Sequence, residues 1–157
     1  QWRVITMAAE FAALAGSRQA EFLRLAWPQF DVDEVRVLRA KQRKGVERFE
    51  RVAASPALQE LRTRLQAIAH DGKVGAVFPN RQGNPYTASG FAAMWGKLMR
   101  EAVATGVVAR RFTFHDLRAH YATVHKELTG VLPDLHQSSA TTARVYDRSR
   151  VARRKAL

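Results

Sequence analysis

Arg18 follows a Gly-Ser pair and precedes Glu21 by three residues. Because Gly16 is suited to end one helix and Ser17 to cap the next, we expect Arg18 at a helix N-terminus. There its guanidinium and the free backbone N–H groups can face one anion. Glu21 has the spacing to hold Arg18 through a carboxylate contact. The pattern is compatible with anion binding, and an exposed arginine with a helical partner is the alternative that this segment alone does not exclude.

His115 and Arg118 form a second chemical segment, three residues apart. This spacing puts both side chains on one face of a helix or tight turn. An imidazole beside a guanidinium supplies hydrogen-bond donors that suit phosphate oxygens. Leu117 and Tyr121 are expected in the core. The alternative is a helix with a capping histidine and a solvated arginine.

Tyr146 ends a third segment, residues 135–146. A phenol is a poor nucleophile at neutral pH, since its pKa is about 10. It becomes effective where cations stabilise the phenolate and the charge of a pentacovalent phosphate. Tyr146 is therefore a candidate nucleophile, with a core or interface tyrosine as the alternative.

Together the three segments resemble the tyrosine recombinases of the phage-integrase type. That family's patterns run roughly Thr-Gly-x-Arg-x-x-Glu-Leu, His-x-Leu-Arg-His-Thr-x-Ala and Leu-Gly-His-x-x-x-x-Thr-Thr-x-x-Tyr. This chain has Ala-Gly-Ser-Arg-Gln-Ala-Glu-Phe at 15–22, His-Asp-Leu-Arg-Ala-His-Tyr-Ala at 115–122, and Leu-His-Gln-Ser-Ser-Ala-Thr-Thr-Ala-Arg-Val-Tyr at 135–146. The order and spacing of the segments also fit, and the resemblance covers nearly the whole chain.

The resemblance implies a role for each matching residue. Arg18 and Arg118 would clamp the scissile phosphate, with Glu21 bracing Arg18. His115 would donate to the phosphate and assist proton transfer, and Tyr146 would attack. The implied reaction cleaves and rejoins double-stranded DNA through a 3′-phosphotyrosine link, and it needs no metal and no cofactor.

Two positions depart from the family pattern or leave it open. The histidine or tryptophan nine residues before the nucleophile falls on Gln137, and His136 lies one place earlier. Glutamine can donate a hydrogen bond to a phosphate oxygen but carries no charge, so both residues are candidates. The family's hairpin lysine, which would protonate the leaving 5′-oxygen, is either Lys41 or Lys44.

The elements that must position these segments are mainly helical. Apolar spacing and capping residues predict helices at 6–15, 18–25, 55–70, 87–105, 114–128 and 141–146. Residues 34–41 and 46–52 alternate apolar and basic side chains, which predicts a β-hairpin turning at Gly45. We therefore expect a mainly α fold with a small antiparallel β-sheet (α+β), the catalytic-domain fold of the tyrosine recombinases.

Positive charge points to the partner. The chain has 26 Lys and Arg against 14 Asp and Glu, a formal net charge of +12. Such a surplus favours a polyanion, and DNA is the leading candidate because phosphate neutralisation releases counterions. On the hairpin, the candidate DNA-binding residues are Arg36, Arg39, Arg43 and Arg48. A basic protein without such a partner is the alternative.

A length of 157 residues suits one domain, here 1–157, in which 147–157 form a basic tail. The resemblance implies the C-terminal part of a longer protein, without the N-terminal DNA-binding domain, acting as a dimer or tetramer on DNA. The absence of cysteine excludes disulfides, Cys-ligated zinc and thiol catalysis. No apolar run reaches the roughly 18–20 residues that span a bilayer. We expect a cytoplasmic, DNA-associated protein, bacterial or phage-encoded, without a membrane partner.

Two other functions agree with much of this pattern. A type IB topoisomerase-like enzyme uses similar residues but relaxes supercoils without strand exchange. A DNA-binding module that keeps the fold but has lost catalysis is the second, and Gln137 is the residue that leaves it open.

Overall fold

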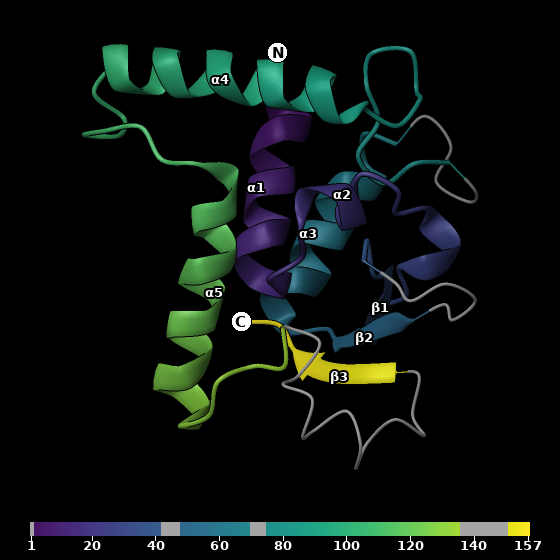
Figure 1. The fold of residues 1–157 in the computed structure, drawn as a ribbon. Helices are drawn as coiled ribbons and strands as arrows, with labels where there is room; N and C mark the ends of the chain where they lie inside the picture. The colour runs from purple at the N-terminus through teal and green to yellow at the C-terminus, as the bar shows by residue number, and fades with distance from the viewer. Residues whose placement is uncertain (1, 42–47, 70–74, 136–150) are drawn as a thin grey trace.

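The computed structural model describes residues 2–41, 48–69, 75–135 and 151–157 (Figure 1). The elements are α1 (Arg3–Ala15), α2 (Gln19–Phe22), the 3-10 turn η1 (Trp27–Gln29), β1 (Glu34–Leu38), β2 (Phe49–Ala53), α3 (Pro56–Gln66), α4 (Ala88–Ala104), α5 (Phe114–Thr129) and β3 (Val151–Lys155). The mainly α fold with a small sheet is confirmed. The predicted turn at Gly45 and the predicted helix at 141–146 lie outside the described residues.

Helix α1 is the central element, with α3 and α5 packed along it and α4 lying across its N-terminal end (Figure 1). It begins three residues earlier than predicted, because Ile5 is fully buried and belongs to its apolar face. Thr6 lies inside the helix, and its hydroxyl donates to the backbone carbonyls of Trp2 and Arg3. The helix ends at Gly16, whose φ of 67° is left-handed and whose N–H donates to Ala12 O at 2.9 Å.

A cluster of phenylalanines fills the space between α1, α2, α4 and α5. Its members among the described residues are Phe11, Phe22, Phe30, Phe78, Phe91 and Phe114. Phe22 contacts Phe114 with ring centroids 5.1 Å apart. Such pairs add about 0.5–1.5 kcal/mol beyond area burial. The contact joins α2 to the start of α5, and thus the segment of Arg18 to that of His115.

The sheet has the order β1-β2-β3, and it is mixed rather than antiparallel. β1 and β2 form the predicted antiparallel pair, with Val35 opposite Val52. β3 pairs in parallel with β2, with Arg154 opposite Val52, so the sheet differs from the predicted antiparallel one, and residues 151–155 of the basic tail form a strand. Alternation of apolar and polar residues can predict a strand, but it cannot predict pairing with a strand about a hundred residues away. Backbone bonds from Ala156 to Ala53 and from Leu157 to Leu14 fix the end of the strand.

Helix α2 is a single turn, shorter than the predicted helix over 18–25. The backbone after it pairs with another segment: Val77 N–H donates to Leu25 O at 2.9 Å, and Trp27 N–H donates to Gly75 O at 3.1 Å. A residue whose backbone N–H or C=O is hydrogen-bonded to another segment cannot use that group for the hydrogen bonds of a helix. The other described helices lie close to their predicted ranges and begin after side-chain caps at Ser55, Thr87 and Thr113. Within the described ranges, no helix has both the length and the apolar character to cross a membrane.

Candidate functional site

A pocket of about 240 Å³ lies between the N-terminal ends of α2 and α5. It is lined by Ser17, Arg18, Gln19, Ala20, Phe114, His115 and Arg118. Two segments that are about a hundred residues apart in the sequence therefore contribute one arginine each, together with a histidine. The pocket contains three of the residues that the sequence singled out for phosphate binding.

Arg18 is held at the edge of the pocket by Glu21. One carboxylate oxygen of Glu21 accepts from the Arg18 backbone N–H at 2.8 Å, and the other accepts from Arg18 Nη1 at 3.0 Å. Glu21 is fully buried, whereas the Arg18 side chain keeps 27% of its exposure. The predicted contact between the two is present. It leaves part of the guanidinium accessible to a ligand.

Arg118 is a buried cation on the first turns of α5. Its Nη1 and Nη2 donate to the carbonyls of Gly16 and Leu135, and its Nη1 lies 4.0 Å from Glu21 Oε2. Burial, and secondarily the nearby charge of Arg18, lowers the pKa of Arg118 to about 10. It is therefore protonated at neutral pH, and two guanidinium groups meet in one pocket.

His115 lies exposed at the start of α5, one turn before Arg118. Its position is set by Thr113, which caps the helix: the Thr113 side chain accepts from Asp116 N–H at 3.3 Å. Asp116 in turn accepts from the backbone N–H of Thr113 at 2.6 Å, a hydrogen bond that lowers the pKa of Asp116. Asp116, the acidic neighbour of His115, therefore stabilises the N-terminus of α5.

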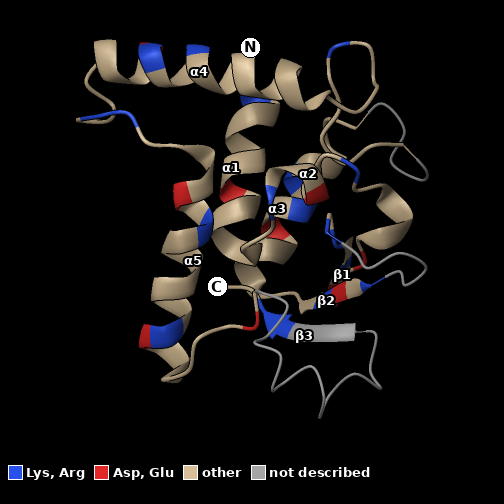
Figure 2. Ribbon diagram, in the orientation of Figure 1, with Lys and Arg blue, Asp and Glu red and all other residues tan. Residues whose placement is uncertain are grey.

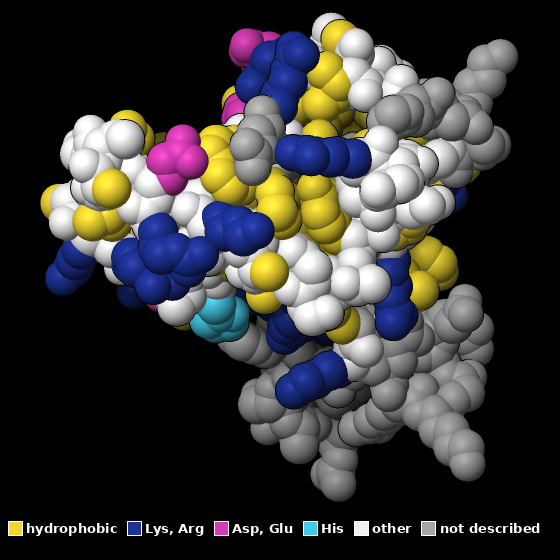
Figure 3. Space-filling view, turned by 90° about the horizontal axis from the view of Figure 1, so that it is seen from above, with side chains coloured by type: hydrophobic (Ala, Val, Ile, Leu, Met, Phe, Trp, Pro, Cys, Tyr) yellow, Lys and Arg dark blue, Asp and Glu magenta, His cyan; other side chains and the backbone are white. Residues whose placement is uncertain are grey.

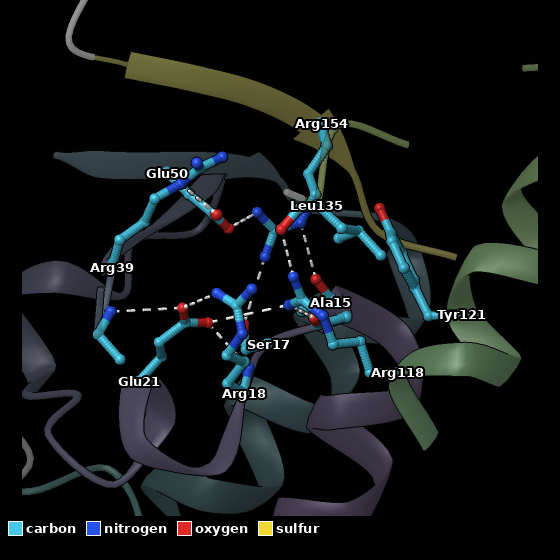
Figure 4. Close-up of polar contacts among 12 residues, drawn as sticks. Ala15, Ser17, Arg18, Glu21, Arg39, Glu50, Arg118, Tyr121, Leu135 and Arg154 are labelled. Atoms are coloured by element: carbon cyan, nitrogen blue, oxygen red, sulfur yellow. Dashed lines mark hydrogen bonds and ion pairs between the residues drawn. The ribbon is translucent and has the colours of Figure 1, made fainter. Parts of the chain in front are cut away.

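A second layer of buried charge lies on the sheet side of Arg18, Glu21 and Arg118 (Figure 4). Glu50 of β2 is fully buried and forms ion pairs with Arg39 and Arg154; Arg39 Nε lies 2.6 Å from Glu50 Oε1. Arg154 Nε donates to Ala15 O at 2.9 Å, and burial lowers the pKa of Arg154 to about 10.

Arg39 does not lie on the exposed edge of the hairpin, where the prediction of DNA contact placed it. Its side chain is 5% exposed, and it pairs with Glu50. Its burial has a signal in the sequence, because Arg39 is in phase with the buried Val35 and Val37, and Glu50 is in phase with the buried Val52. No such signal identifies Arg154.

The other predicted residues are placed only in part. Lys41 and Arg36 are exposed, Arg36 donating to Pro28 O at 2.6 Å, and Arg48 is half-buried. The candidates outside the described residues are Arg43, Lys44, His136, Gln137 and Tyr146.

Lys and Arg occur on the helices, the strands and the loops between them (Figure 2). They also form several patches on the face of the molecule shown in Figure 3, interleaved with hydrophobic surface. Arg110 and Arg111 are exposed in the segment that leads into α5. Within the described residues, no group of three or more His, Cys, Asp or Glu has the arrangement to hold a metal ion.

A model of the Phage integrase family matches residues 4–129, a range that includes Arg18, His115 and Arg118. The chain belongs to the phage integrase family. A search of curated protein sequences finds no match to this integrase-family domain.

Solved structures show the same fold. The Tn1549 transposon integrase in complex with circular intermediate DNA is 17% identical, with a TM-score of 0.67 over 92% of this chain and 54% of that one. A lambda integrase dimer bound to a COC′ core site is 18% identical, with a TM-score of 0.63 over 88% and 52%. The lambda integrase catalytic core is 17% identical, with a TM-score of 0.61 over 81% and 74%. This integrase-family domain thus has the tyrosine recombinase catalytic-domain fold and spans about half the length of the first two structures.

Proposed function

We propose that this domain is the catalytic domain of a site-specific DNA recombinase, which cleaves and rejoins strands through a 3′-phosphotyrosine intermediate. The observation that carries the proposal is the meeting of Arg18, His115 and Arg118 in one pocket. Family membership supports the same reaction, because the family model spans all three residues.

The pocket suits a phosphodiester in the transition state of strand cleavage. Charge develops on the non-bridging oxygens there, and preorganised cations lower its energy without moving. The carbonyls of Gly16 and Leu135 take up one N–H on each terminal nitrogen of Arg118. A guanidinium has five N–H donors, so others remain for a phosphate oxygen. Arg18 supplies a second guanidinium and His115 a further donor.

Tyr146 is the proposed nucleophile, which attacks the scissile phosphorus in line with the leaving 5′-oxygen. The new bond joins the tyrosine oxygen to the 3′-phosphate as the bond to the 5′-oxygen breaks. His115 would assist removal of the phenol proton, and Lys41 or Lys44 gives a proton to the departing 5′-oxygen. His136 or Gln137 would donate to the phosphate from the same segment. Attack by a 5′-hydroxyl on the phosphotyrosine reverses the step, so the phosphoester energy is conserved.

The sequence around Tyr146 is anchored beside the pocket on both sides. Leu135, eleven residues before it, accepts from Arg118, and Arg154, eight residues after it, donates to Ala15. Both anchors come from the two layers of charge that surround the pocket, which supports the assignment of Tyr146 over Tyr86 or Tyr121.

Double-stranded DNA is the proposed substrate and partner, with exposed Arg36 and half-buried Arg48 among the contacts of the hairpin. Solved lambda integrase structures contain a dimer bound to a core site and a tetramer bound to a Holliday junction. We propose the same kind of assembly for this chain, as part of a longer, DNA-associated protein in the cytoplasm.

The test is capture of a covalent protein–DNA adduct on nicked suicide duplexes drawn from a pool of randomised sequences. Wild type should form an adduct that survives SDS, and Tyr146→Phe should form none. Tyr86→Phe is the matched control and should retain the adduct. An adduct formed by Tyr146→Phe would refute the assignment.

DNA-binding, supercoil-relaxation and two-site exchange assays beside the adduct capture separate the two alternative functions. DNA binding by wild type without any adduct would indicate a recombinase-fold binding module. An adduct with supercoil relaxation, but without exchange between two sites, would indicate a topoisomerase-like enzyme.

A further inference from the structure

Arg154 is a buried cation that belongs to none of the three segments resembling the family. Its side chain is 2% exposed, and its guanidinium forms an ion pair with fully buried Glu50. Two more contacts involve the start of the pocket wall rather than the sheet. Nε donates to Ala15 O at 2.9 Å, and Nη2 donates to Ser17 Oγ at 3.4 Å (Figure 4).

The turn from Ala15 to Ser17 is held by two arginines, one from β3 and one from α5. Arg154 binds the carbonyl of Ala15, and Arg118 binds the carbonyl of Gly16, the next residue. Arg18 follows this turn directly, so the direction of its side chain depends on the turn's backbone. A displacement of the turn moves Arg18, and also removes one of the two carbonyls that orient Arg118.

The charges around the pocket also connect Arg154 with Arg18 and Arg118. Among the described residues, Arg18, Arg39, Arg118 and Arg154 surround two buried carboxylates, Glu21 and Glu50. Exposed Asp134 adds one more carboxylate near Arg39, so four guanidinium groups against three carboxylates still leave an excess of positive charge around the pocket. Desolvating such ions is costly, and apolar side chains of similar volume often stabilise a fold as well or better. A positive potential toward a bound phosphate gives this arrangement a function.

We propose that Arg154 is a positioning residue for the phosphate pocket: it fixes the Ala15–Ser17 turn, and through it Arg18 and Arg118, for binding of the scissile phosphate. This inference rests on the proposed recombinase function. Glu50 is the counter-ion that holds Arg154 in place, and Arg39 shares that carboxylate.

The first variant is Arg154→Lys, which keeps the charge. A lysine ammonium is a point charge on a flexible stem, and it cannot reproduce the planar fork that binds Glu50, Ala15 and Ser17 together. Misplacement of a phosphate ligand by about 1 Å costs roughly 100-fold in rate, so we expect single-turnover adduct formation to fall about 10- to 100-fold. DNA affinity should change less than about 3-fold, because the exposed basic residues are intact.

Arg51→Lys is the matched control. Arg51 is the neighbouring arginine on β2, and its guanidinium binds Glu34 at the surface of the sheet. Its substitution should leave the adduct rate within about 2-fold of wild type. A general effect of altering an arginine in the sheet would lower both rates alike.

A second readout is the affinity of the pocket for inorganic phosphate, followed by titration calorimetry. Arg154→Lys and Arg18→Lys should both weaken phosphate binding, while Arg51→Lys should not. If wild type binds phosphate but forms no adduct, the recombinase proposal fails and the phosphate titration still tests Arg154. If wild type shows neither, both proposals fall.

The proposal is overturned if Arg154→Lys cleaves at the wild-type rate and binds phosphate as wild type does. Should that variant fold poorly, Arg154→Met removes the guanidinium while Glu50 keeps its ion pair with Arg39. A folded Arg154→Met variant with the wild-type adduct rate would equally overturn the proposal.

Discussion

Replacing Gly16 by alanine should destabilise the domain far more than the same change at Gly130. Both glycines end a helix with positive φ, 67° and 76°. An added Cβ at Gly130 meets nothing within 4 Å, whereas at Gly16 it would lie 2.4 Å from Cδ1 of Tyr121. The two positions therefore share the backbone cost and differ in packing.

The expected size follows from these contacts. A left-handed alanine costs about 1–2 kcal/mol at either site. At Gly16 the Cβ is more than 1 Å inside the roughly 3.5 Å at which carbon atoms normally pack. The ring of Tyr121 cannot move away freely, because it is fully buried and its hydroxyl donates to Lys155 O at 2.5 Å. Overpacking typically adds about 1–3 kcal/mol, so Gly16→Ala should lose about 2–5 kcal/mol in all.

Urea unfolding followed by circular dichroism measures both losses. With a slope near 2 kcal/mol/M, an excess of about 2 kcal/mol for Gly16→Ala lowers its midpoint about 1 M below that of Gly130→Ala. In a Tyr121→Leu background the excess should shrink, since the clashing ring is gone. Equal midpoints for the two alanine variants would refute the packing argument.

Two further predictions concern the same region. Burial raises the pKa of Tyr121 to about 12, so its contribution to stability is present below the unfolded pKa of about 10 and is lost as pH rises toward 12. Tyr121→Phe should therefore be about 0.5–1.5 kcal/mol less stable than wild type at pH 8, and urea unfolding at higher pH should show this difference shrinking; a constant difference would contradict it. Glu21→Gln should cost about 3 kcal/mol in thermal or urea unfolding, because it leaves Arg18 and Arg118 without their buried counter-ion. The control Glu34→Gln removes a partly exposed pair and should cost less than about 1 kcal/mol, so equal losses would count against the role given to Glu21.

The local parts of the site could be predicted from the sequence, since short spacing determines them. Arg18 and Glu21 are three residues apart, and so are His115 and Arg118, so one turn of backbone decides which side chains share a face. The apolar phase of the helices also places Phe22 and Phe114 inward. Their contact brings the two segments together. The order of residues in the sequence does not predict that contact, and only the family resemblance implies it.

The second layer of charge could be predicted only in part. Arg39 and Glu50 are in phase with buried valines. Burial of a charged side chain is nevertheless not expected from the sequence until its ion-pair partner is known. That partner, Arg154, lies in a run of basic residues that has the composition of a solvated tail. Its burial depends on parallel pairing of β3 with β2, and a five-residue strand far along the chain has too little pattern to specify it.

The contacts of Arg154 also set an order of events during synthesis. Its bonds to Ala15 and Ser17 join residues 139 and 137 positions apart, and contacts of such long range form late in folding. The turn before Arg18 therefore lacks one of its two supports until the ribosome has made residue 154, eight residues beyond Tyr146. A nascent chain that already contains the proposed nucleophile would still have an incomplete phosphate pocket, so the proposed strand cleavage would await synthesis of β3.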